Sequence, residues 1–397
     1  MSSPGSDYAT WHSVEVPLAG GAIATATKAG LFAHGRHDPA ALLIAERAVV
    51  SRGDVVAYLN CGSGLFGVVA ALRGEASQVV LTDRNVISAE AARRTMTMNG
   101  VAVATVALQQ GLGGVLPPST ADVVAIRIPH EKLAILQLLR DAFRALRMGG
   151  RCYLAGATIE GVKPAARAME QLFGQANVLA TGGGYRIVGA TKSRDDAAVS
   201  APFDNPFLDT GCFHEVRATL RGRDYRLFAR PGVFSWDHLD EATQILAEAM
   251  VIQPGESVLD LGCGSGALGV VAGGLSQGQR VCLVDADIEA IRSAARSADA
   301  AGLSDLRVLT SDITSAVPNE RFDVVVSNPP FHLGKSTALD VPGQFIRQSY
   351  DVLTPGGRLL LVANRTLPYE RVVSETFGHV RILHDGARFK VLAATKG

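Results

Sequence analysis

The chain has 397 residues, too many for one ordinary hydrophobic core, so two domains of roughly 100–200 residues each are expected. Its composition, with 47% hydrophobic and 19% charged residues, excludes a disordered or fibrous protein. The formal net charge is zero, but residues 1–192 hold 18 Lys and Arg against 13 Asp and Glu, whereas residues 193–397 hold 20 against 25. A small excess of positive charge in the first half would suit contact with a polyanion.

The first residues, MSSPGSDYATWHSVEV, lack the basic and apolar regions of a signal peptide. No run approaches the ~18 apolar residues of a membrane-spanning helix, so we expect a cytoplasmic location. The five cysteines are scattered and never spaced C-x-x-C. We therefore expect buried free thiols, with neither a disulfide framework nor a metal site.

The first half of the chain alternates helix-like and strand-like segments. A helical pattern at 29–46 precedes a strand and glycine turn at 55–72 and a strand that ends at Asp83, followed by the strand-like segments 122–129 and 146–156. Two more β-like runs, VLAT and YRIVGAT, suggest a late hairpin. This alternation predicts an α/β fold with a mostly parallel sheet and helices on both faces.

The same segments recur in the same order 201 to 207 residues later. VVAYLNCGSGLFGVVAAL (55–72) corresponds to SVLDLGCGSGALGVVAGGL (257–275), and Asp83 corresponds to Asp285. The chain is therefore predicted to be a tandem duplication of one domain.

A segment rich in Pro, Asp and Ser separates the two copies. We predict that residues 193–212 are a linker between a first domain, residues 1–192, and a second domain, residues 213–397.

Three glycines turn a strand into a helix in the second copy: Gly262, Gly264 and Gly266. Such a turn lies at the carboxyl ends of the strands, where ligands bind, and glycine allows a ligand to approach the backbone closely. Asp285 ends the next strand, where a carboxylate can bond both hydroxyls of a ribose. Because GSGALG (264–269) also satisfies the dinucleotide fingerprint, the turn alone does not separate NAD from S-adenosylmethionine.

Two further acids favour S-adenosylmethionine as the cofactor. Asp260 precedes the glycine turn, where its carboxylate could meet a ligand ammonium, and Asp312 ends a third strand. S-adenosylmethionine carries an ammonium group and NAD does not. A dehydrogenase would also need a proton-transfer residue over the nicotinamide, and only His332 lies near the site in sequence.

The strand DVVVSN runs into Pro329, Pro330 and Phe331. A planar amine needs acceptors for both hydrogens before its nitrogen can attack a methyl group, and the Asn328 side-chain oxygen and the Pro329 carbonyl can serve. The prolines add no competing N–H group and keep the segment rigid. Phe331 offers a stacking face, worth about 1–3 kcal/mol per base. These four residues therefore suit an amine on an aromatic ring, or an amide such as that of a protein glutamine.

The order of LDLGCGSG, VDAD, SD, SNPPF and LTPGGRLLLVAN resembles class I S-adenosylmethionine-dependent N-methyltransferases. The duplication, together with PGVFSWDHLDEATQIL, NPPFHLGKSTALD, ANRTLPYE and ARFKVLAA, resembles the bacterial ribosomal RNA guanine-N2 methyltransferases of the small subunit and their large-subunit relatives. The resemblance is specific over residues 213–397 and rests on layout over residues 1–192. It implies two tandem Rossmann-like methyltransferase domains, each with a seven-stranded, mostly parallel sheet and a reversed last strand.

The resemblance also implies methylation of a guanine N2 amine in ribosomal RNA, with 16S RNA as the first choice and ribosomal RNA or a ribosomal subunit as the partner. Target-amine contacts would come from Asn328 and Pro329, next to Pro330, with the guanine flipped onto Phe331. The resemblance places Phe234 and Asp240 over the methionine end of the cofactor. The remaining cofactor contacts that it implies are Asp260, Gly262, Gly264, Asp285 and Asp312, and the glycine turn itself adds Gly266 to these candidates.

The first copy has lost key residues. Tyr58 replaces Asp260, Asn60 replaces Gly262, and Arg127-Ile128-Pro129 replaces Asn328-Pro329-Pro330. We expect this copy to be non-catalytic and either to stabilise the second domain or to hold RNA.

Basic residues of both copies are candidates for RNA contact. Arg140, Arg144 and Arg147 are expected on one helix face of the first copy. The other candidates are Arg84, Arg93, Arg94 and Arg127 in the first copy and Lys335, Arg388 and Lys390 in the second. A non-catalytic RNA-binding ribosome assembly factor remains an alternative.

Overall fold

The computed structural model describes residues 8–195, 201–277, 280–303, 305–330 and 340–397. These residues form two units, one comprising residues 9–212 and the other joining Tyr8 to residues 213–397. Residues 201–212, predicted as part of a linker, belong to the first unit. Phe203 and Leu208 are buried in its core.

The first unit alternates strands and helices as predicted from its sequence. Its elements are β1 (His12–Val16), β2 (Ile23–Thr27), α1 (Pro39–Arg47), β3 (Val55–Leu59), α2 (Leu65–Leu72), β4 (Gln78–Asp83), α3 (Val86–Met98), β5 (Ala104–Leu108), β6 (Ala121–Arg127), α4 (Lys132–Ala145), β7 (Leu146–Ala157), α5 (Val162–Phe173), β8 (Asn177–Gly182) and β9 (Tyr185–Thr191). Strands β3 to β9 form one sheet in the order β5-β4-β3-β6-β7-β9-β8, in which β9 is antiparallel to both neighbours.

The second unit repeats this arrangement. Its elements are β10 (His214–Leu220), β11 (Arg223–Ala229), α6 (Glu241–Ala249), β12 (Val258–Leu261), α7 (Ala267–Leu275), β13 (Val281–Asp285), α8 (Ile288–Ala300), β14 (Arg307–Thr310), β15 (Phe322–Ser327), α9 (Asp340–Val352), β16 (Leu353–Asn364), α10 (Tyr369–Phe377), β17 (Arg381–Asp385) and β18 (Phe389–Thr395). Strands β12 to β18 form a sheet in the order β14-β13-β12-β15-β16-β18-β17, with β18 antiparallel to β16 and β17. The predicted duplication, the seven-stranded sheets and the reversed last strands are confirmed.

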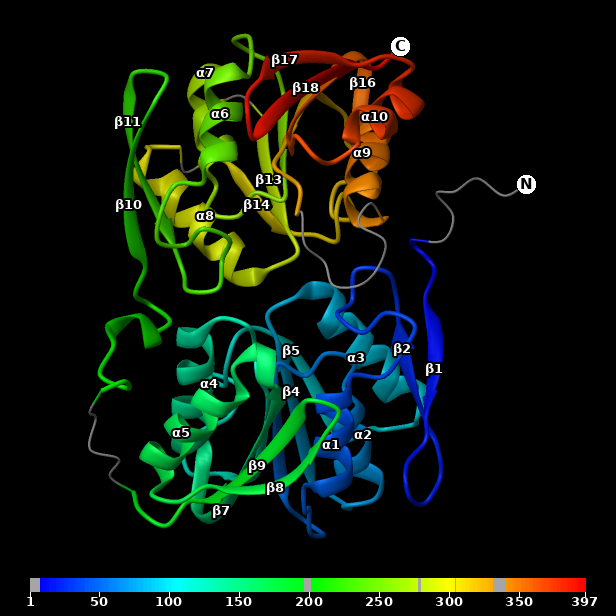
Figure 1. Cartoon of the computed structure of the whole chain (residues 1–397), viewed down its shortest axis with the longest axis vertical. Coiled ribbons are helices and arrows are strands. Elements are labelled where there is room, and N and C mark those ends of the chain that lie inside the picture. Colours follow the sequence, from blue (N-terminus) through cyan, green and yellow to red (C-terminus); the bar gives the residue numbers. More distant parts are fainter. Residues whose placement is uncertain (1–7, 196–200, 278–279, 304, 331–339) are drawn as a thin grey trace. The chain divides into compact units, whose positions relative to one another are not determined.

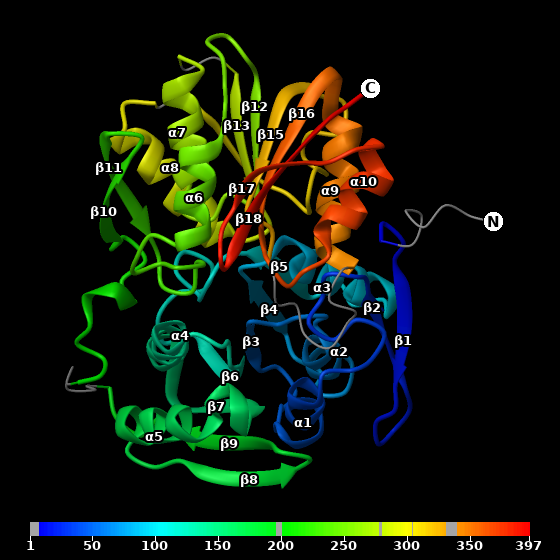
Figure 2. The same ribbon diagram turned by 45° about the horizontal axis from the view of Figure 1, so that its top comes forward.

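Each sheet is covered on both faces because its strands are apolar on both sides. In β3, Val56 and Tyr58 pack on the face covered by α1, α2 and α3, whereas Ala57 and Leu59 face the opposite core under α4 and α5 (Figure 1). In the second unit, α6, α7 and α8 cover one face of the sheet and α9 and α10 the other (Figure 2). Parallel strands buried on both faces have near-continuous apolar sequences, which explains why the sheet strands were recognisable.

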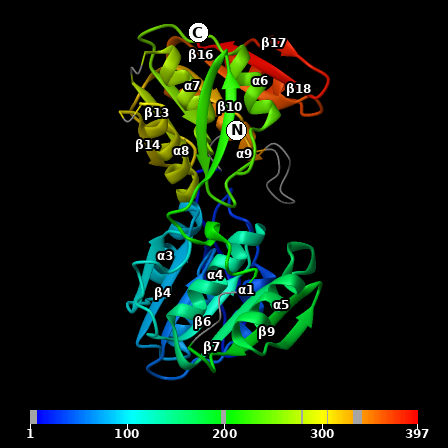
Figure 3. The ribbon, with the colours of Figure 1, turned by 90° about the vertical axis from the view of Figure 1, so that its left-hand side faces the viewer.

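Two antiparallel ribbons lie outside the sheets and were not predicted. Strand β1 pairs with β2, and β10 pairs with β11, the second ribbon being conspicuous in Figure 3. Each ribbon is hydrogen-bonded to the helix that follows the second sheet strand in chain order. The Ala26 N–H donates to Thr95 Oγ1 of α3 at 2.9 Å, and the Phe228 N–H donates to Ser297 Oγ of α8 at 2.8 Å. The duplication therefore includes the ribbons.

Candidate active site

The register of three parallel strands brings the predicted site residues of the second unit to one edge of the sheet. Asp260 of β12 lies opposite Leu283 of β13 and Val326 of β15. The glycine turn after β12, Asp285 at the end of β13 and Asn328 just after β15 therefore emerge together. This is the carboxyl edge at which α/β sheets bind ligands.

The glycine turn needs glycine for two different reasons. Gly262, Gly264 and Gly266 have φ angles of +76°, +54° and +84°, a region that other residues rarely adopt. A Cβ on Gly266 would lie 3.0 Å from the Ala294 Cα in α8, whereas a Cβ on Gly264 would meet nothing within 4 Å. Gly266 therefore permits close packing of the following helix, and Gly264 leaves open space above the turn.

Asp285 is held by backbone N–H groups. Its Oδ2 accepts a hydrogen bond from the Gly264 N–H at 2.9 Å, and its Oδ1 accepts one from the Asp287 N–H at 3.0 Å. Asp287 caps α8 by accepting from the Glu289 N–H at 2.9 Å. Asp285 thus orients the glycine turn, and the neighbouring Asp287 is the helix cap.

Asp260 is a buried carboxyl with one unused acceptor. Its Oδ2 accepts from the Gly269 N–H at 2.7 Å, and its Oδ1 has no partner among the described residues although the side chain is only 1% exposed. Burial raises the pKa of Asp260 to about 7, and the charge of Asp285 adds to the rise against the opposing Gly269 N–H. A carboxyl in this position suits a ligand that brings a positive charge.

Asn328 presents an oriented amide. Its Nδ2 donates to Asp240 Oδ2 at 3.0 Å and to Thr243 Oγ1 at 2.9 Å. Its Oδ1 is buried and has no partner within the part of the chain that the structure describes. The side chain therefore offers one acceptor. Pro329 is buried beside it and Pro330 is half-buried, whereas Phe331 lies outside the described residues.

The remaining predicted cofactor residues have varied surroundings. Asp312 accepts a hydrogen bond from the Tyr8 hydroxyl at 2.7 Å, and burial, reinforced by the Asp312 charge, raises the pKa of Tyr8. Phe234 is 60% exposed. Asp240 caps α6 through the Thr243 N–H at 2.9 Å. Neither Tyr8 nor Thr243 was predicted, because their contacts join segments that are far apart in sequence and carry no motif.

The arginines expected on one helix face are not together on a helix, so that expectation was wrong. Helix α4 ends at Ala145, and Arg147 lies on β7, where it forms an ion pair with Asp122. Arg140 donates to the Leu208 carbonyl, and Arg144 is exposed. The helix ends early because Leu146 pairs with Ala121 of β6.

The candidate RNA contacts of the second copy also differ in exposure. Lys390 is buried and forms an ion pair with Glu370, whereas the Arg388 side chain is 71% exposed and lies beside Glu241. Lys335 lies outside the described residues.

In the first copy, other side chains stand at the positions of Asp260 and Asn328, whose oxygens have no partner among the described residues of the second copy. Tyr58, at the position of Asp260, is fully buried and packs edge-to-face on Phe66 with 5.5 Å between ring centroids. Asn60, at the position of Gly262, adopts a φ of +53° and donates from Nδ2 to the Arg127 carbonyl at 2.9 Å. The carboxyl that could meet an ammonium is therefore replaced by a buried ring.

Arg127, at the position of Asn328, is locked by two acids. It forms ion pairs with Asp38 at 2.9 Å and with Glu160 at 2.7 Å, and its side chain is 7% exposed. Burial lowers the pKa of Arg127, but the two acids outweigh this effect and hold it above the ordinary value. Arg127 is therefore not available for RNA, contrary to its inclusion among the candidate contacts.

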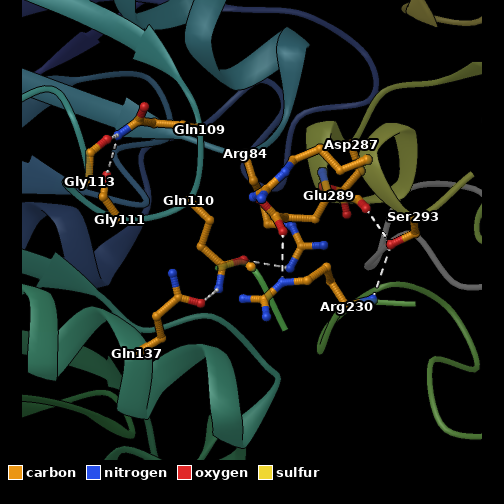
Figure 4. Close-up of polar contacts among 12 residues, drawn as sticks. Arg84, Gln109, Gln110, Gly111, Gly113, Gln137, Arg230, Asp287, Glu289 and Ser293 are labelled. Carbon is orange, nitrogen blue, oxygen red and sulfur yellow. Dashed lines mark hydrogen bonds and ion pairs between the residues drawn. The ribbon is translucent and has the colours of Figure 1, made fainter. Parts of the chain in front are cut away.

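A chain of polar side chains lies near the carboxyl edge of the first sheet. Arg84 donates to Gln110 Oε1 and Gln110 donates to Gln137 Oε1, each at 2.8 Å (Figure 4). Gln110 stands at the position of Asp312. Together with Asn60 and Asp83, Arg84 and Gln110 line a small pocket. Asp83 keeps the contacts of Asp285, since it accepts from the Gly62 and Asn85 N–H groups, each at 2.9 Å.

The topology and the polar residues at the carboxyl edge of the second sheet define a class I methyltransferase. The family model described as the methyltransferase small domain matches residues 22–189 and 224–393. No helix in the described ranges is long and apolar enough to cross a membrane, and the same residues contain no group of three or more His, Cys, Asp or Glu that could hold a metal ion.

Individual relatives narrow the class to one family. Over 275 residues the chain is 33% identical to "Ribosomal RNA small subunit methyltransferase C" of Hahella chejuensis, which covers 69% of this chain and 78% of the relative. The protein of that name from Erwinia tasmaniensis is 40% identical over 166 residues, 42% of this chain and 48% of the relative. Apart from the Hahella protein, the chain spans about half the length of the curated relatives reported with it.

A solved structure matches both units. The 16S rRNA N2 guanine methyltransferase of T. thermophilus, solved in complex with AdoMet and guanosine, is 30% identical with a TM-score of 0.82, and the match covers 98% of this chain and 99% of that one. The chain belongs to the ribosomal RNA small subunit methyltransferase C family, as its sequence motifs predicted, and it is a methyltransferase.

Proposed function

We propose that this protein transfers the methyl group of AdoMet to the exocyclic N2 amine of a guanine in 16S ribosomal RNA. The observation that carries the proposal is the Asn328 amide, whose buried Oδ1 lacks a partner among the described residues while its Nδ2 is held by two acceptors. A buried acceptor left unpaired costs about 1–3 kcal/mol, which a substrate N–H would recover.

The cofactor, when bound, supplies an electrophilic methyl group. The Asp260 Oδ1, which has no partner among the described residues, suits its ammonium, and Asp285, at the end of β13, suits ribose hydroxyls. The open space above Gly264 allows a ligand to approach the turn. These features support S-adenosylmethionine over NAD, because NAD has no ammonium for a buried carboxyl.

The protein itself makes the amine more nucleophilic by accepting hydrogen bonds from its two N–H groups. A guanine amine shares its lone pair with the ring, and the nitrogen pyramidalises when both N–H groups have acceptors. In this proposal Asn328 Oδ1 accepts a hydrogen bond from one N–H group, and the Pro329 carbonyl accepts one from the other. Proline at 329 and 330 adds no N–H donor that would compete for these acceptors. The proposal extends to Phe331 as the stacking face.

Contact with RNA is proposed for the exposed arginines. Arg144 and Arg147 of the first unit and Arg388 of the second are exposed, as phosphate contacts require. Arg140, which bonds to a backbone carbonyl, and the buried Lys390 are less suited to this role.

The test is methyl transfer from tritiated AdoMet. The acceptors are 16S RNA and small ribosomal subunits from a strain that lacks this modification, and the labelled RNA is digested to identify the nucleoside. We expect N2-methylguanosine. Asn328→Ala should lower the rate of transfer by at least about 100-fold, because the amine loses an oriented acceptor, while AdoMet binding stays close to that of the wild type. Asn319→Ala, at an exposed asparagine, is the control and should retain full activity.

The outcome separates the competing functions. Label in a protein glutamine would mean that the substrate is a protein amide and not RNA. Binding of RNA without any label in RNA or protein would indicate a non-catalytic assembly factor. Full activity of Asn328→Ala would contradict the role of the amide.

A further inference from the structure

We propose that Asp240 and Thr243 are positioning residues that hold the Asn328 amide with its oxygen toward the target amine. The proposal rests on the proposed function, since it assigns to Asn328 the acceptor role described above. It differs from the role that the family resemblance implies for Asp240, which is closure over the methionine end of the cofactor.

The hydrogen-bond network permits only one orientation of the amide. The Asp240 Oδ2 carboxylate oxygen accepts from Asn328 Nδ2 at 3.0 Å and from Thr243 Oγ1 at 3.2 Å. Because the Thr243 hydroxyl donates its hydrogen to the carboxylate, its lone pair is left to accept from Asn328 Nδ2 at 2.9 Å. A flipped amide would place its oxygen against a carboxylate oxygen with no hydrogen between them.

The fixed nitrogen determines what the opposite end of the amide can do. With both Nδ2 hydrogens engaged, Asn328 can present only Oδ1, which is buried and has no partner in the described part of the chain. An asparagine free to rotate would present a donor in part of its population, and a donor repels an amine N–H. An asparagine amide can either donate or accept a hydrogen bond. Asp240 and Thr243 fix it so that only its oxygen, an acceptor, faces the substrate.

The carboxylate is itself held by a rigid element. Asp240 is the N-cap of α6, and the same Oδ2 accepts from the Thr243 N–H at 2.9 Å. Asp240 and Thr243 therefore lie at the start of a helix, and the position of that helix does not depend on the ligand.

The first copy has the same kind of contact from a helix-cap carboxylate, but to a different side chain. Asp38, at the position of Asp240, is the N-cap of α1, and its Oδ2 forms an ion pair with Arg127 at 2.9 Å. In both copies the cap carboxylate thus binds a side chain at the end of the fourth sheet strand in chain order, Arg127 being the last residue of β6 and Asn328 the first residue after β15. The hydroxyl differs, because Ala41 stands at the position of Thr243. The hydroxyl accompanies the asparagine and is absent where the arginine stands.

The test uses Asp240→Ser and a pair of substitutions at Thr243 in the full-length protein. Serine is as good an N-cap as aspartate, so Asp240→Ser should fold normally, while its shorter hydroxyl, which can donate as well as accept, allows the Asn328 amide to flip. Thr243→Val removes the hydroxyl at constant shape, and Thr243→Ser restores it. The same change in the first copy, Asp38→Ser, is the matched control, expected to lower the melting temperature but to leave kcat within about twofold.

We expect kcat to fall by about 100-fold in Asp240→Ser and by about tenfold in Thr243→Val, with Thr243→Ser close to the wild type. The Kd for AdoMet, measured by calorimetry, should stay within about twofold of the wild-type value in all three. A kcat that remains at the wild-type level in Asp240→Ser and Thr243→Val would overturn the proposal. So would an increased Kd with kcat restored at saturating AdoMet, which would make Asp240 a cofactor contact.

The same assay keeps the two proposals apart. Wild-type label in a nucleoside other than N2-methylguanosine would overturn the proposed function alone. The ratio of variant to wild-type kcat would still decide whether Asp240 and Thr243 orient the amide.

Discussion

The carboxyl group of Asp260 connects burial to cofactor affinity. The group is almost fully buried, its pKa is raised to about 7 chiefly by burial, and one oxygen is unpartnered among the described residues. Because the unfolded carboxyl ionises near pH 4, the folded state retains a proton that the unfolded state has lost between about pH 4 and pH 7. The contribution of Asp260 to folding stability therefore decreases as the pH rises through this window.

This residue predicts a pH-dependent affinity for AdoMet. An ammonium favours the ionised carboxylate, so binding releases a proton below the raised pKa, and the Kd should fall by up to about tenfold per pH unit on raising the pH from about 6 to 7 and then level off. Calorimetry in two buffers of different ionisation enthalpy measures both quantities. Asp260→Asn should bind weakly without this dependence, whereas Asp299→Asn, at an exposed position, should retain it. A flat wild-type profile would contradict the role of Asp260.

The meeting of the candidate residues at one edge of the sheet was predictable from sequence, but their hydrogen bonds were not. Asp260, Asp285 and Asn328 follow sheet strands, and parallel strands place their carboxyl ends at one edge. The direction of the Asn328 amide depends on Asp240, 88 residues away in the chain. No local sequence pattern encodes that contact, so only the folded structure shows that Asp240 orients the amide.

At the scale of elements, the glycine turn determines how closely two helices approach. Gly266 combines a φ of +84° with a Cβ position 3.0 Å from the Ala294 Cα, and Gly64 of the first copy combines +82° with 3.2 Å from the Ala92 Cα. In both copies the obstacle is helix backbone, which cannot move aside as a flexible side chain can.

Gly266→Ala and Gly64→Ala should therefore lower the free energy of unfolding of their respective units by about 2–4 kcal/mol, through backbone strain plus overpacking. Urea denaturation provides the measurement. Gly302→Ala is the matched control, because Gly302 has a φ of +72° but open space around its Cβ position, and it should lose only about 1 kcal/mol. Equal losses in Gly266→Ala and Gly302→Ala would show that close helix approach is not the cause.

The elements missed from the sequence are those whose partners are distant or whose periodicity is weak. Strands β10 and β11 carry arginines among apolar residues, and their anchor, Ser297, lies 69 residues beyond Phe228. The apolar spacing of LLRDAFRALRMGG is helical throughout, yet the helix gives way to β7 at Leu146 because that residue pairs with β6. Tertiary pairing overrides local preference in both cases.

At the scale of the whole molecule, the duplication predicts how many cofactor molecules one chain binds. The first unit repeats the fold but has Tyr58 in place of the buried carboxyl and an arginine locked by two acids in place of Asn328. Only the second unit has an unused carboxylate oxygen suited to an ammonium, among the residues that the structure describes.

We therefore expect one AdoMet per chain in equilibrium dialysis. Asp285→Asn should weaken this binding by at least about tenfold, because the residue orients the glycine turn and is placed to meet the ribose. Asp83→Asn, the equivalent change in the first copy, should leave both the affinity and the stoichiometry unchanged. A stoichiometry of two, or weaker binding in Asp83→Asn, would mean that the first copy still takes the cofactor.

The ion pairs of Arg127 have a consequence for any attempt to place an amide at this position. Replacing Arg127 by asparagine alone would leave the buried Glu160 and the partly buried Asp38 without their cation, and breaking a buried ion pair costs about 3–5 kcal/mol. Asp38 and Glu160 lie on different elements, so no single further change relieves both. An asparagine at position 127 therefore needs at least two accompanying substitutions, and each incomplete combination gives a less stable protein.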